Sequence, residues 1–153
     1  MVGETVVSRM DLLIEWGDCD PAGIVYYPRY SVFFDNAANA LMAKVGLPKH
    51  EVMERYQLFG MPMVETRVKF SIPSRWGERV VIESRVEEWR RSSFVTHHRL
   101  LKDDKVAVEG WDTRVWTVRD PEDPERIRSF PIPQEVIERF GATAQAEAAA
   151  PGP

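Results

Sequence analysis

One helical pattern, followed by four long extended runs, most constrains what this chain can fold into. Across residues 30–45, apolar side chains recur at three- and four-residue steps and cover most of the circumference, which predicts a helix buried on several sides. Gly46 is placed to end that helix. The extended runs come later, each with β-branched or aromatic residues in partial alternation, at 63–72, 79–89, 93–102 and 106–119.

Short polar segments join these runs, so neighbours along the chain are expected to pair in antiparallel fashion. The joining segments are 74–78, 90–92 and 102–105. A further extended segment, at 6–16, precedes the helix. One strand, one buried helix and four strands predict an α+β fold in which a sheet covers the helix.

The remaining segments are shorter or simpler in composition. Residues 50–56 favour a short second helix, and four prolines among charged residues at 120–133 predict an extended surface segment rather than a strand. Residues 134–140 suit a last helical turn. The low-complexity end, with few large apolar groups, predicts one domain at 1–140 and a flexible tail at 141–153.

Composition excludes several classes of protein. A chain of 153 residues that is 44% hydrophobic is long enough for one packed domain, and a net charge of −4 argues against a general nucleic-acid binder. A single cysteine forms no internal disulfide, and the first residues lack a secretory apolar core, so we expect a cytoplasmic protein. No run approaches the roughly 20 apolar residues of a membrane helix.

The segment 16–28 combines two carboxylates with turn residues and a helix start. Pro28 suits a first helical turn, so the free N–H groups of that helix face the loop that carries Asp18 and Asp20. Such a site could stabilise an oxyanion beside an acid. Alternatively, both aspartates are turn and cap residues, because Asp readily bonds to nearby backbone N–H groups.

Other catalytic chemistries find little support. His50, His97 and His98 form no metal-ligand pattern with Cys19, so no metal site is predicted. Neighbouring His97 and His98 point to opposite faces of a strand, which favours one packed and one solvated ring. Cys19 lies between two acids, which disfavour a reactive thiolate, so we expect a packing residue.

Five short motifs resemble the 4-hydroxybenzoyl-CoA thioesterase family, and together they cover most of residues 9–140. The motifs are Gly-Asp-Cys-Asp-Pro-Ala-Gly-Ile-Val at 17–25 followed by two aromatics and proline, Gly-Leu-Pro at 46–48, Gly-Met-Pro-Met-Val at 60–64, Glu-Trp-Arg-Arg-Ser-Ser-Phe-Val at 88–95, and Arg-Ile-Arg at 126–128. The resemblance implies the hotdog fold, a five-stranded antiparallel sheet wrapped around one long helix.

The same resemblance implies an acyl-CoA thioesterase. Asp20 matches the catalytic acid, acting as nucleophile or general base, and Asp18 is then structural. The Tyr27 backbone N–H would donate to the thioester oxygen, and Gly23 would allow close backbone approach. No cofactor is implied, because coenzyme A is part of the substrate and of the product.

Coenzyme A carries phosphates, which call for local positive charge. Two arginine pairs occur in this acidic chain, and arginine's planar fork suits phosphate oxygens. The matching positions are Arg90, Arg91, Ser93, Arg126 and Arg128. Ser92 departs from the family pattern, where a lysine is expected, so one phosphate contact is missing or comes from elsewhere.

Three positions match the family's acyl pocket. Asp35, on the apolar helix, matches an acid near the substrate's ring hydroxyl; a hydrogen bond to Asn36, Asn39 or the backbone is the competing interpretation. His50 stands where a pocket tryptophan is expected, and Met61 where a threonine is expected. These departures leave open a pocket for benzoyl or aliphatic acyl groups.

Two alternatives to an aromatic acyl-CoA thioesterase stay open. One is a short-chain aliphatic acyl-CoA thioesterase of the same fold, and the other is a non-catalytic acyl-CoA-binding hotdog protein. An exposed sheet edge and a site shared between chains imply at least a homodimer, and the resemblance suggests a homotetramer.

Overall fold

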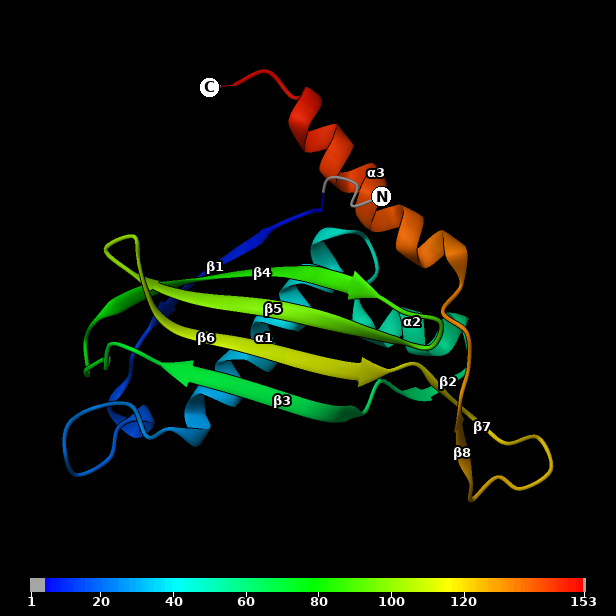
Figure 1. The fold of residues 1–153 in the computed structure, drawn as a ribbon, viewed down its shortest axis with the longest axis horizontal. Coiled ribbons are helices and arrows are strands. Elements are labelled where there is room, and N and C mark those ends of the chain that lie inside the picture. The colour runs from blue at the N-terminus through cyan, green and yellow to red at the C-terminus, as the bar shows by residue number, and fades with distance from the viewer. Residues whose placement is uncertain (1–4, 153) are drawn as a thin grey trace.

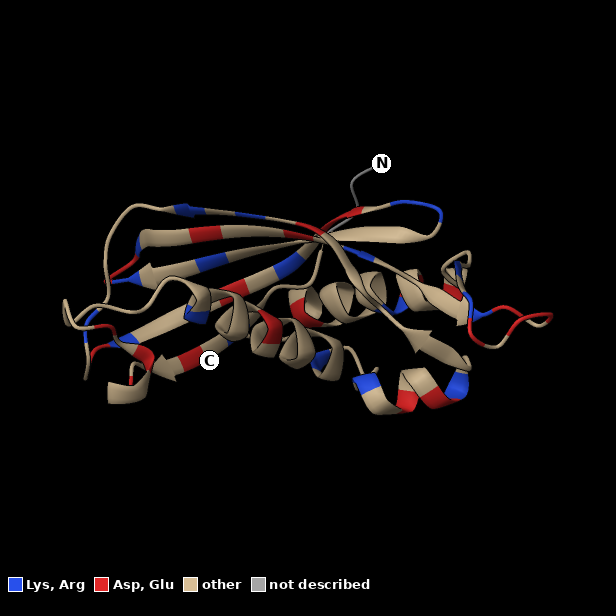
Figure 2. Cartoon of the chain, turned by 90° about the horizontal axis from the view of Figure 1, so that it is seen from below, with Lys and Arg blue, Asp and Glu red and all other residues tan. Residues whose placement is uncertain are grey.

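A five-stranded antiparallel sheet packs on one long helix. The structure, a computed structural model, describes residues 5–152. Helix α1 (Pro28–Lys44) lies across one face of a sheet with strand order β1-β4-β5-β6-β3 (Figures 1 and 2). The strands are β1 (Ser8–Leu13), β3 (Met63–Phe70), β4 (Arg79–Trp89), β5 (Ser93–Lys102) and β6 (Lys105–Val115). The predicted α+β class and five-stranded hotdog sheet are confirmed.

Helix α1 buries one stripe rather than several sides. The stripe consists of Tyr30, Phe33, Phe34, Ala37, Leu41 and Met42, at the three- and four-residue steps of an amphipathic helix. Val32, on another side, is 42% exposed. The predicted burial on several sides is wrong for the single chain, because the sheet covers only one side of α1.

The prediction that the runs at 63–72 and 79–89 pair with each other is also wrong. β3 pairs with β6, and β4 lies between β1 and β5. The link between β3 and β4 is longer than a hairpin turn and crosses the end of the sheet, where Ser71 N–H donates to the Ala107 carbonyl (2.8 Å). Of the three connections predicted to be hairpins, those between β4 and β5 and between β5 and β6 are hairpins, as their short turns predict.

A smaller sheet extends the fold beyond β6. Helix α2 (Lys49–Arg55) confirms the short second helix, and β2 (Leu58–Gly60), β7 (Thr117–Arg119) and β8 (Ile127–Ser129) form a three-stranded sheet. The run at 106–119 is therefore two strands. β8 corrects the prediction of a strandless 120–133, because its residues lie between the prolines and pair with β7.

Helix α3 (Gln134–Ala149) continues well past the predicted last turn. Its Ala-rich end has high helix propensity, and Ala144 packs into the core beside Phe140. Lys44 Nζ pairs with Glu147 Oε1 at 2.7 Å, which ties this end to α1. None of the described helices is both long and apolar enough to cross a membrane.

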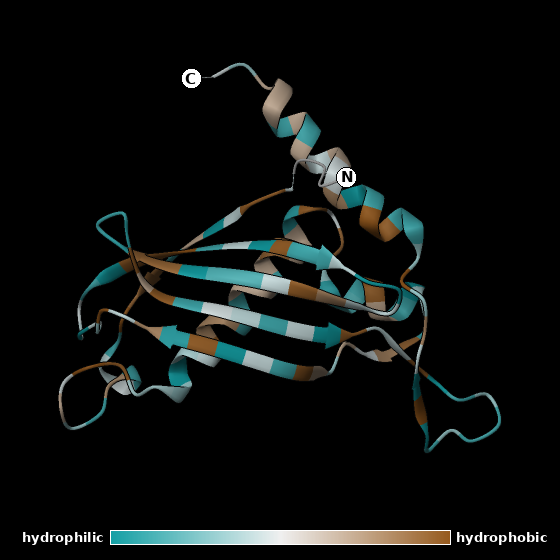
Figure 3. Cartoon of the chain, in the orientation of Figure 1, coloured by the Kyte–Doolittle hydropathy of each residue, from teal (hydrophilic) through white to brown (hydrophobic). Residues whose placement is uncertain are grey.

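Two apolar clusters fill the interior, and apolar segments recur along α1 and the strands (Figure 3). One cluster joins the first half of α1 to β4, β5 and β6, around Phe34, Ile82 and Leu100. The other joins the end of α1 to α2 and α3, around Leu41 and Trp116.

The two adjacent histidines of β5 point to opposite faces, as predicted, but both are buried. His98 stacks on Phe34 with ring centroids 4.9 Å apart and has no exposed surface. His97 stacks on Trp111, and its Nε2 lies 2.7 Å from Glu109 Oε1. The predicted solvated ring is wrong because Trp111 and its neighbours cover His97.

Candidate active site

The segment before α1 doubles back on itself. Asp20 N–H donates to the Ile24 carbonyl (2.9 Å), and Tyr26 N–H donates to the Asp18 carbonyl (2.8 Å). Cys19 and Val25 form an isolated antiparallel bridge between the two arms. The turn therefore sets Asp20 on one arm and the entrance to α1 on the other.

Asp18 is a buried structural residue. Its Oδ2 accepts from the Glu15 N–H at 2.9 Å. Its Oδ1 accepts from Arg29 Nε at 3.1 Å and from Arg29 Nη2 at 2.9 Å. The carboxylate thus links the start of the loop to the first turn of α1, which fits the structural role predicted for it.

Asp20 is half-buried and only partly engaged. Its Oδ1 accepts from the Ala22 N–H at 2.8 Å, an Asx turn that fixes the side chain. No donor from residues 5–152 bonds to its Oδ2. One carboxylate oxygen is therefore oriented by the loop while the other is free to act.

Tyr27 caps α1 through its backbone. Pro28, the first helical residue, has no N–H, so Tyr27 supplies the last amide before the helix. That amide donates to no acceptor in the described part of the chain. The Tyr27 side chain is 67% exposed, so its backbone is the group fixed by the fold.

Position 23 requires glycine because of its backbone angle, not because neighbouring atoms leave no room for a side chain. Its φ is +79°, which other residues rarely adopt. A Cβ placed there would meet Arg75 Nη1 only at 3.9 Å, an ordinary contact. In this chain, the predicted close approach at Gly23 involves no neighbouring protein backbone.

An apolar groove of about 260 Å³ adjoins the Tyr27 cap. It lies between the loop and the end of β3 and is lined by Ile24, Val25, Tyr27, Tyr30, Phe70, Ser71, Ile72 and Pro73. Burial raises the pKa of the Tyr30 phenol, so this wall of the groove stays uncharged. The groove can hold an apolar group beside the free amide.

Asp35 and Met61 meet through a residue that sequence reasoning missed. Arg114, on β6, donates from Nη2 to Asp35 Oδ1 at 2.5 Å and from Nη1 to the Met61 carbonyl at 3.0 Å. The sequence analysis expects Asp35 to bond to a substrate hydroxyl, to Asn36, to Asn39 or to the backbone. It does not anticipate the pair with Arg114.

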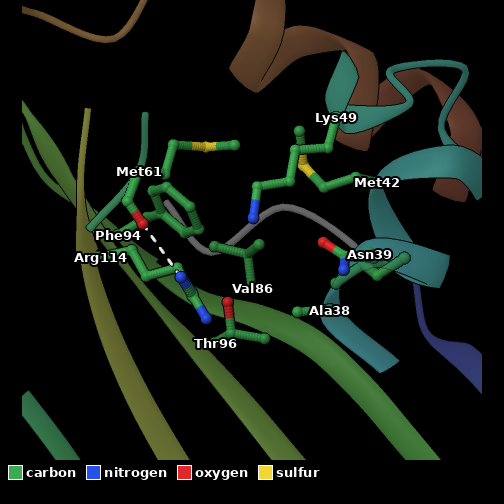
Figure 4. A pocket seen from close by; sticks show the side chains of 10 residues that line it. Ala38, Asn39, Met42, Lys49, Met61, Val86, Phe94, Thr96 and Arg114 are labelled. Carbon is green, nitrogen blue, oxygen red and sulfur yellow. Dashed lines mark hydrogen bonds between the residues drawn. The ribbon is translucent and has the colours of Figure 1, made fainter. Parts of the chain in front are cut away.

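A second pocket opens beside Arg114, between the end of α1 and the sheet (Figure 4). It is lined by Ala38, Asn39, Leu41, Met42, Lys49, Met61, Val86, Phe94, Thr96 and Arg114. His50 is 82% exposed on the side chain and faces away, whereas its neighbour Lys49 lines the pocket.

The predicted phosphate-binding residues lie at the other end of the sheet from Asp20 (Figure 1). Arg90, Arg91 and Ser93 follow β4, and Arg126 and Arg128 belong to the β7–β8 hairpin. β4 has 11 residues, so about 35 Å separates its ends. A single chain therefore does not bring these arginines to its own Asp20.

Local acids moderate the charge of both arginine pairs. Arg90 donates to both carboxylate oxygens of Glu88 at 3.0 Å, and these bonds lower the pKa of Glu88. The loop before Arg126 holds four acidic residues and appears as an acidic strip in Figure 2. Arg91 is exposed and has no carboxylate partner among residues 5–152.

The sequence holds a signal for some of the site residues that sequence analysis missed. Asp112 and Arg114 occupy alternate positions of β6 after Val108 and Gly110, and this alternation marks the face toward α1. Two charged residues on an inward face signal a polar site. Lys49 carried no such signal, because it begins a short helix of mixed composition.

The described residues hold no group of three or more His, Cys, Asp or Glu side chains arranged for a metal ion. Cys19 packs against the core cluster around Phe34. What the site offers is a carboxylate oxygen, a free helix-start amide and apolar walls. Those groups suit acyl transfer.

Comparison with known proteins identifies the family. The sequence model of the Thioesterase-like superfamily matches residues 14–140. The chain belongs to this superfamily. It is 35% identical over 136 residues to 4-hydroxybenzoyl-CoA thioesterase of Pseudomonas sp. (strain CBS-3), covering 84% of this chain and 94% of the relative.

Solved structures agree with the superfamily assignment. A mutant 4-hydroxybenzoyl-CoA thioesterase complexed with 4-hydroxybenzoyl-CoA superposes with a TM-score of 0.78 at 31% identity, covering 88% of this chain and 98% of that one. A gentisyl-coenzyme A thioesterase gives 0.73 at 28% identity, covering 87% and 98%. The chain is thus a hotdog-fold thioesterase, an enzyme that hydrolyses thioesters.

Proposed function

We propose that this superfamily member hydrolyses an aromatic acyl-CoA, 4-hydroxybenzoyl-CoA or a close relative, to the free acid and coenzyme A. One observation carries the proposal: Asp20, with one free carboxylate oxygen, shares a tight turn with the unpaired Tyr27 amide beside an apolar groove. The 35% sequence identity to a 4-hydroxybenzoyl-CoA thioesterase supports an aromatic acyl group in the substrate.

In this proposal the Tyr27 N–H donates to the thioester oxygen as negative charge develops there. The free oxygen of Asp20 attacks the carbonyl carbon, the C–S bond breaks, and the sulfur leaves as a thiolate that takes a proton from solvent. Water then cleaves the resulting mixed anhydride and restores the carboxylate. Alternatively, Asp20 removes a proton from the water that attacks directly. Both routes use the same two groups.

Coenzyme A enters only as part of the substrate and leaves as product. Its phosphates would bind to Arg91 and Ser93 after β4, with Arg90, Arg126 and Arg128 nearby in the fold. Because these residues lie at the far end of the sheet, a phosphate group could reach them only if another chain supplies them. The proposed site therefore includes two chains.

The exposed edge strand β3 favours such a pairing. Met63, Val64 and Phe70 are 37%, 63% and 52% exposed, and an unpaired strand edge readily pairs with another strand. A two-fold dimer would set two β3 strands antiparallel. The Phe70 end of one chain, with its catalytic loop, would then lie beside the Met63 end of the other, with its Arg114 pocket.

A homodimer is thus part of the proposed function. Assembly of two dimers into a homotetramer, and a cytoplasmic location, stay predictions. They follow from the family resemblance and from the single cysteine of the chain.

The proposal is tested by thiol release from a panel of CoA esters. The panel holds 4-hydroxybenzoyl-, benzoyl-, phenylacetyl- and short aliphatic acyl-CoA, each with the wild type, Asp20→Ala and Asp11→Ala. Asp11 is an exposed residue of β1 and serves as the matched control. We expect aryl-CoA hydrolysis that Asp20→Ala reduces by at least about 100-fold, with folding unchanged by circular dichroism.

Other outcomes separate the alternatives. Faster hydrolysis of the aliphatic esters would support an aliphatic acyl-CoA thioesterase. Equal rates for wild type and Asp20→Ala would refute the carboxylate mechanism. Binding of acyl-CoA without any thiol release would support a non-catalytic acyl-CoA-binding protein.

A further inference from the structure

The pocket beside Arg114 contains a lysine that points inward. Lys49 begins α2 at the mouth of the pocket, and its ammonium extends between Asn39 on one side and Met61 and Phe94 on the other (Figure 4). The lining is otherwise mainly apolar. A cation directed into such surroundings is unfavourable unless a negative group joins it.

Arg114, the other cation of the pocket, is already compensated. Its guanidinium bonds to Asp35 and to the Met61 carbonyl. Lys49 forms no ion pair with any carboxylate among residues 5–152. Two cations and one carboxylate therefore leave the pocket with an excess positive charge, located at the Lys49 ammonium.

The apolar walls suit a flat ring. Phe94 and Val86 rise from the sheet, and Met42 and Met61 close the sides with flexible thioethers. The polar groups of Asn39 and Thr96 lie among them. A ring with a polar substituent on its edge matches this arrangement of apolar walls and converging polar groups.

We propose that Lys49 is a specificity-determining residue that selects aryl thioesters bearing a carboxylate on the ring. The inference rests on the proposed function and narrows its substrate class. The acyl group would reach this pocket from the catalytic loop of the partner chain, which antiparallel β3 strands set beside it.

A ring carboxylate fits better than a ring hydroxyl. A ring hydroxyl could accept from the Lys49 ammonium or donate to the second oxygen of Asp35, but it carries no charge to balance the excess positive charge of the pocket. A carboxylate accepts hydrogen bonds only, and Lys49 supplies up to three donors. Among mainly apolar side chains, a charge-assisted pair is stronger than a neutral hydrogen bond.

The Lys49 side chain must move to admit the ring. In this structure about 20 Å³ of the pocket is free, and the Lys49 side chain extends into it (Figure 4). Lysine has a long flexible stem, so it can withdraw to the mouth while its ammonium keeps contact with a bound group. Met42 and Met61 can adjust in the same way.

The kinetic test compares benzoyl-CoA with its 3-carboxy and 4-carboxy derivatives. We expect wild-type kcat/KM to favour at least one carboxy isomer over benzoyl-CoA by about tenfold or more. Lys49→Met should abolish that ratio and Lys49→Glu should reverse it. Lys105→Met, at the start of β6 and far from the pocket at the end of that strand, should leave the ratio unchanged. An equal ratio in wild type and Lys49→Met would overturn the proposal.

A binding measurement keeps the inference separate from catalysis. Phenacyl-CoA and carboxyphenacyl-CoA are thioethers that no thioesterase cleaves, and calorimetry gives their Kd values for the full chain. Tighter binding of a carboxyphenacyl isomer, lost in Lys49→Met, supports the pocket assignment even if no ester is hydrolysed. Equal binding of both ligands by the wild type refutes it, even if the enzyme hydrolyses benzoyl-CoA.

Discussion

Arg29 holds Asp18 from the first turn of α1 through two hydrogen bonds to one carboxylate oxygen, at 2.9 and 3.1 Å. The Asp18 side chain is 9% exposed, whereas that of Arg29 is 41% exposed. The pair joins the loop that carries Asp20 to the helix whose start supplies the Tyr27 amide. Two groups with proposed catalytic roles are thus kept in register by residues that take no part in the reaction.

Replacing Arg29 with methionine should loosen this register. The buried Asp18 carboxylate would keep only the Glu15 N–H as a donor. We expect the free energy of unfolding to fall by about 2 kcal/mol, the usual contribution of hydrogen bonds to a charged group. The kcat on an aryl-CoA should fall as well, because Asp20 and Tyr27 are less well oriented. Urea unfolding and thiol release measure the two effects.

Arg9→Met is the matched control for Arg29→Met. Arg9 pairs with Glu83 at 2.6 Å, but its side chain is 56% exposed, so its loss should change stability by less than about 1 kcal/mol. Equal losses in the two variants would contradict the role given to Arg29.

Gly110 lies directly under the ring of Phe34. A Cβ at this position would sit 2.6 Å from Phe34 Cε2, and the ring cannot move freely because it stacks on His98. We therefore expect Gly110→Ala to destabilise the protein by about 1–3 kcal/mol through overpacking. Thermal unfolding gives the difference.

Gly141→Ala, in contrast to Gly110→Ala, is expected to increase the free energy of unfolding. Gly141 lies in α3, and a Cβ there meets no atom within 4 Å. This change should stabilise the helix by about 0.5–1 kcal/mol. The prediction fails if both alanine variants shift stability in the same direction.

Asp112 makes stability depend on pH in the acid range. Burial alone would raise the pKa of Asp112, but the Thr66 hydroxyl, which donates to Oδ1 at 2.6 Å, the His98 ring with its Nε2 3.4 Å from Oδ2, and the nearby Arg114 cation outweigh burial and lower it. A lowered folded-state pKa contributes stability above the unfolded value, near 3.8. That contribution disappears as pH falls through the folded-state value.

Asp112→Asn should therefore lower the free energy of unfolding by about 2 kcal/mol at pH 7, and the difference from wild type should shrink below pH 4. Urea unfolding between pH 3 and pH 7 measures it. Asp11→Asn, on an exposed position of β1, is the control and should follow the wild type. A constant difference at all pH values would exclude this linkage.

The sequence predicts a structural feature best when the interacting residues lie close together along the chain. The catalytic loop is contiguous, so its turn residues, its carboxylates and Pro28 could be interpreted together. The β5–β6 hairpin was equally local, since Asp103 and Asp104 occupy a tight turn with φ of 47° and 63°. These local features were predicted with nearly correct bounds.

Features that join distant segments were missed. Asp35 and Arg114 are 79 positions apart, and their contact depends on the position of β6 beneath α1. The pairing of β3 with β6 likewise depends on a crossover that no local pattern specifies. The tail was mistaken for a flexible segment in its helical part because low complexity hid a regular helix, anchored at Ala144.

Dimerisation through β3 predicts a specific effect at the strand edge. Val64 is 63% exposed on β3, and lysine at an edge position discourages pairing with another strand. We expect the wild type to elute as a dimer or larger assembly and Val64→Lys to shift toward monomer in light scattering. Thiol release should fall with the dimer fraction. Lys105→Glu, at the first residue of β6, is the charge-changing control.

Mixed dimers distinguish a two-chain site from a one-chain site. One variant, Asp20→Ala, lacks the catalytic acid. The other variant, Asn39→Trp, carries a tryptophan that fills the pocket beside Arg114 of its own chain. If each site takes its acid from one chain and its pocket from the other, a random equal mixture restores about a quarter of wild-type activity, because half of the dimers hold one intact site of two. If one chain supplied both parts, every site in the mixture would carry one defect. The mixture would then show no more activity than the average of the two variants alone, and the shared site would be refuted.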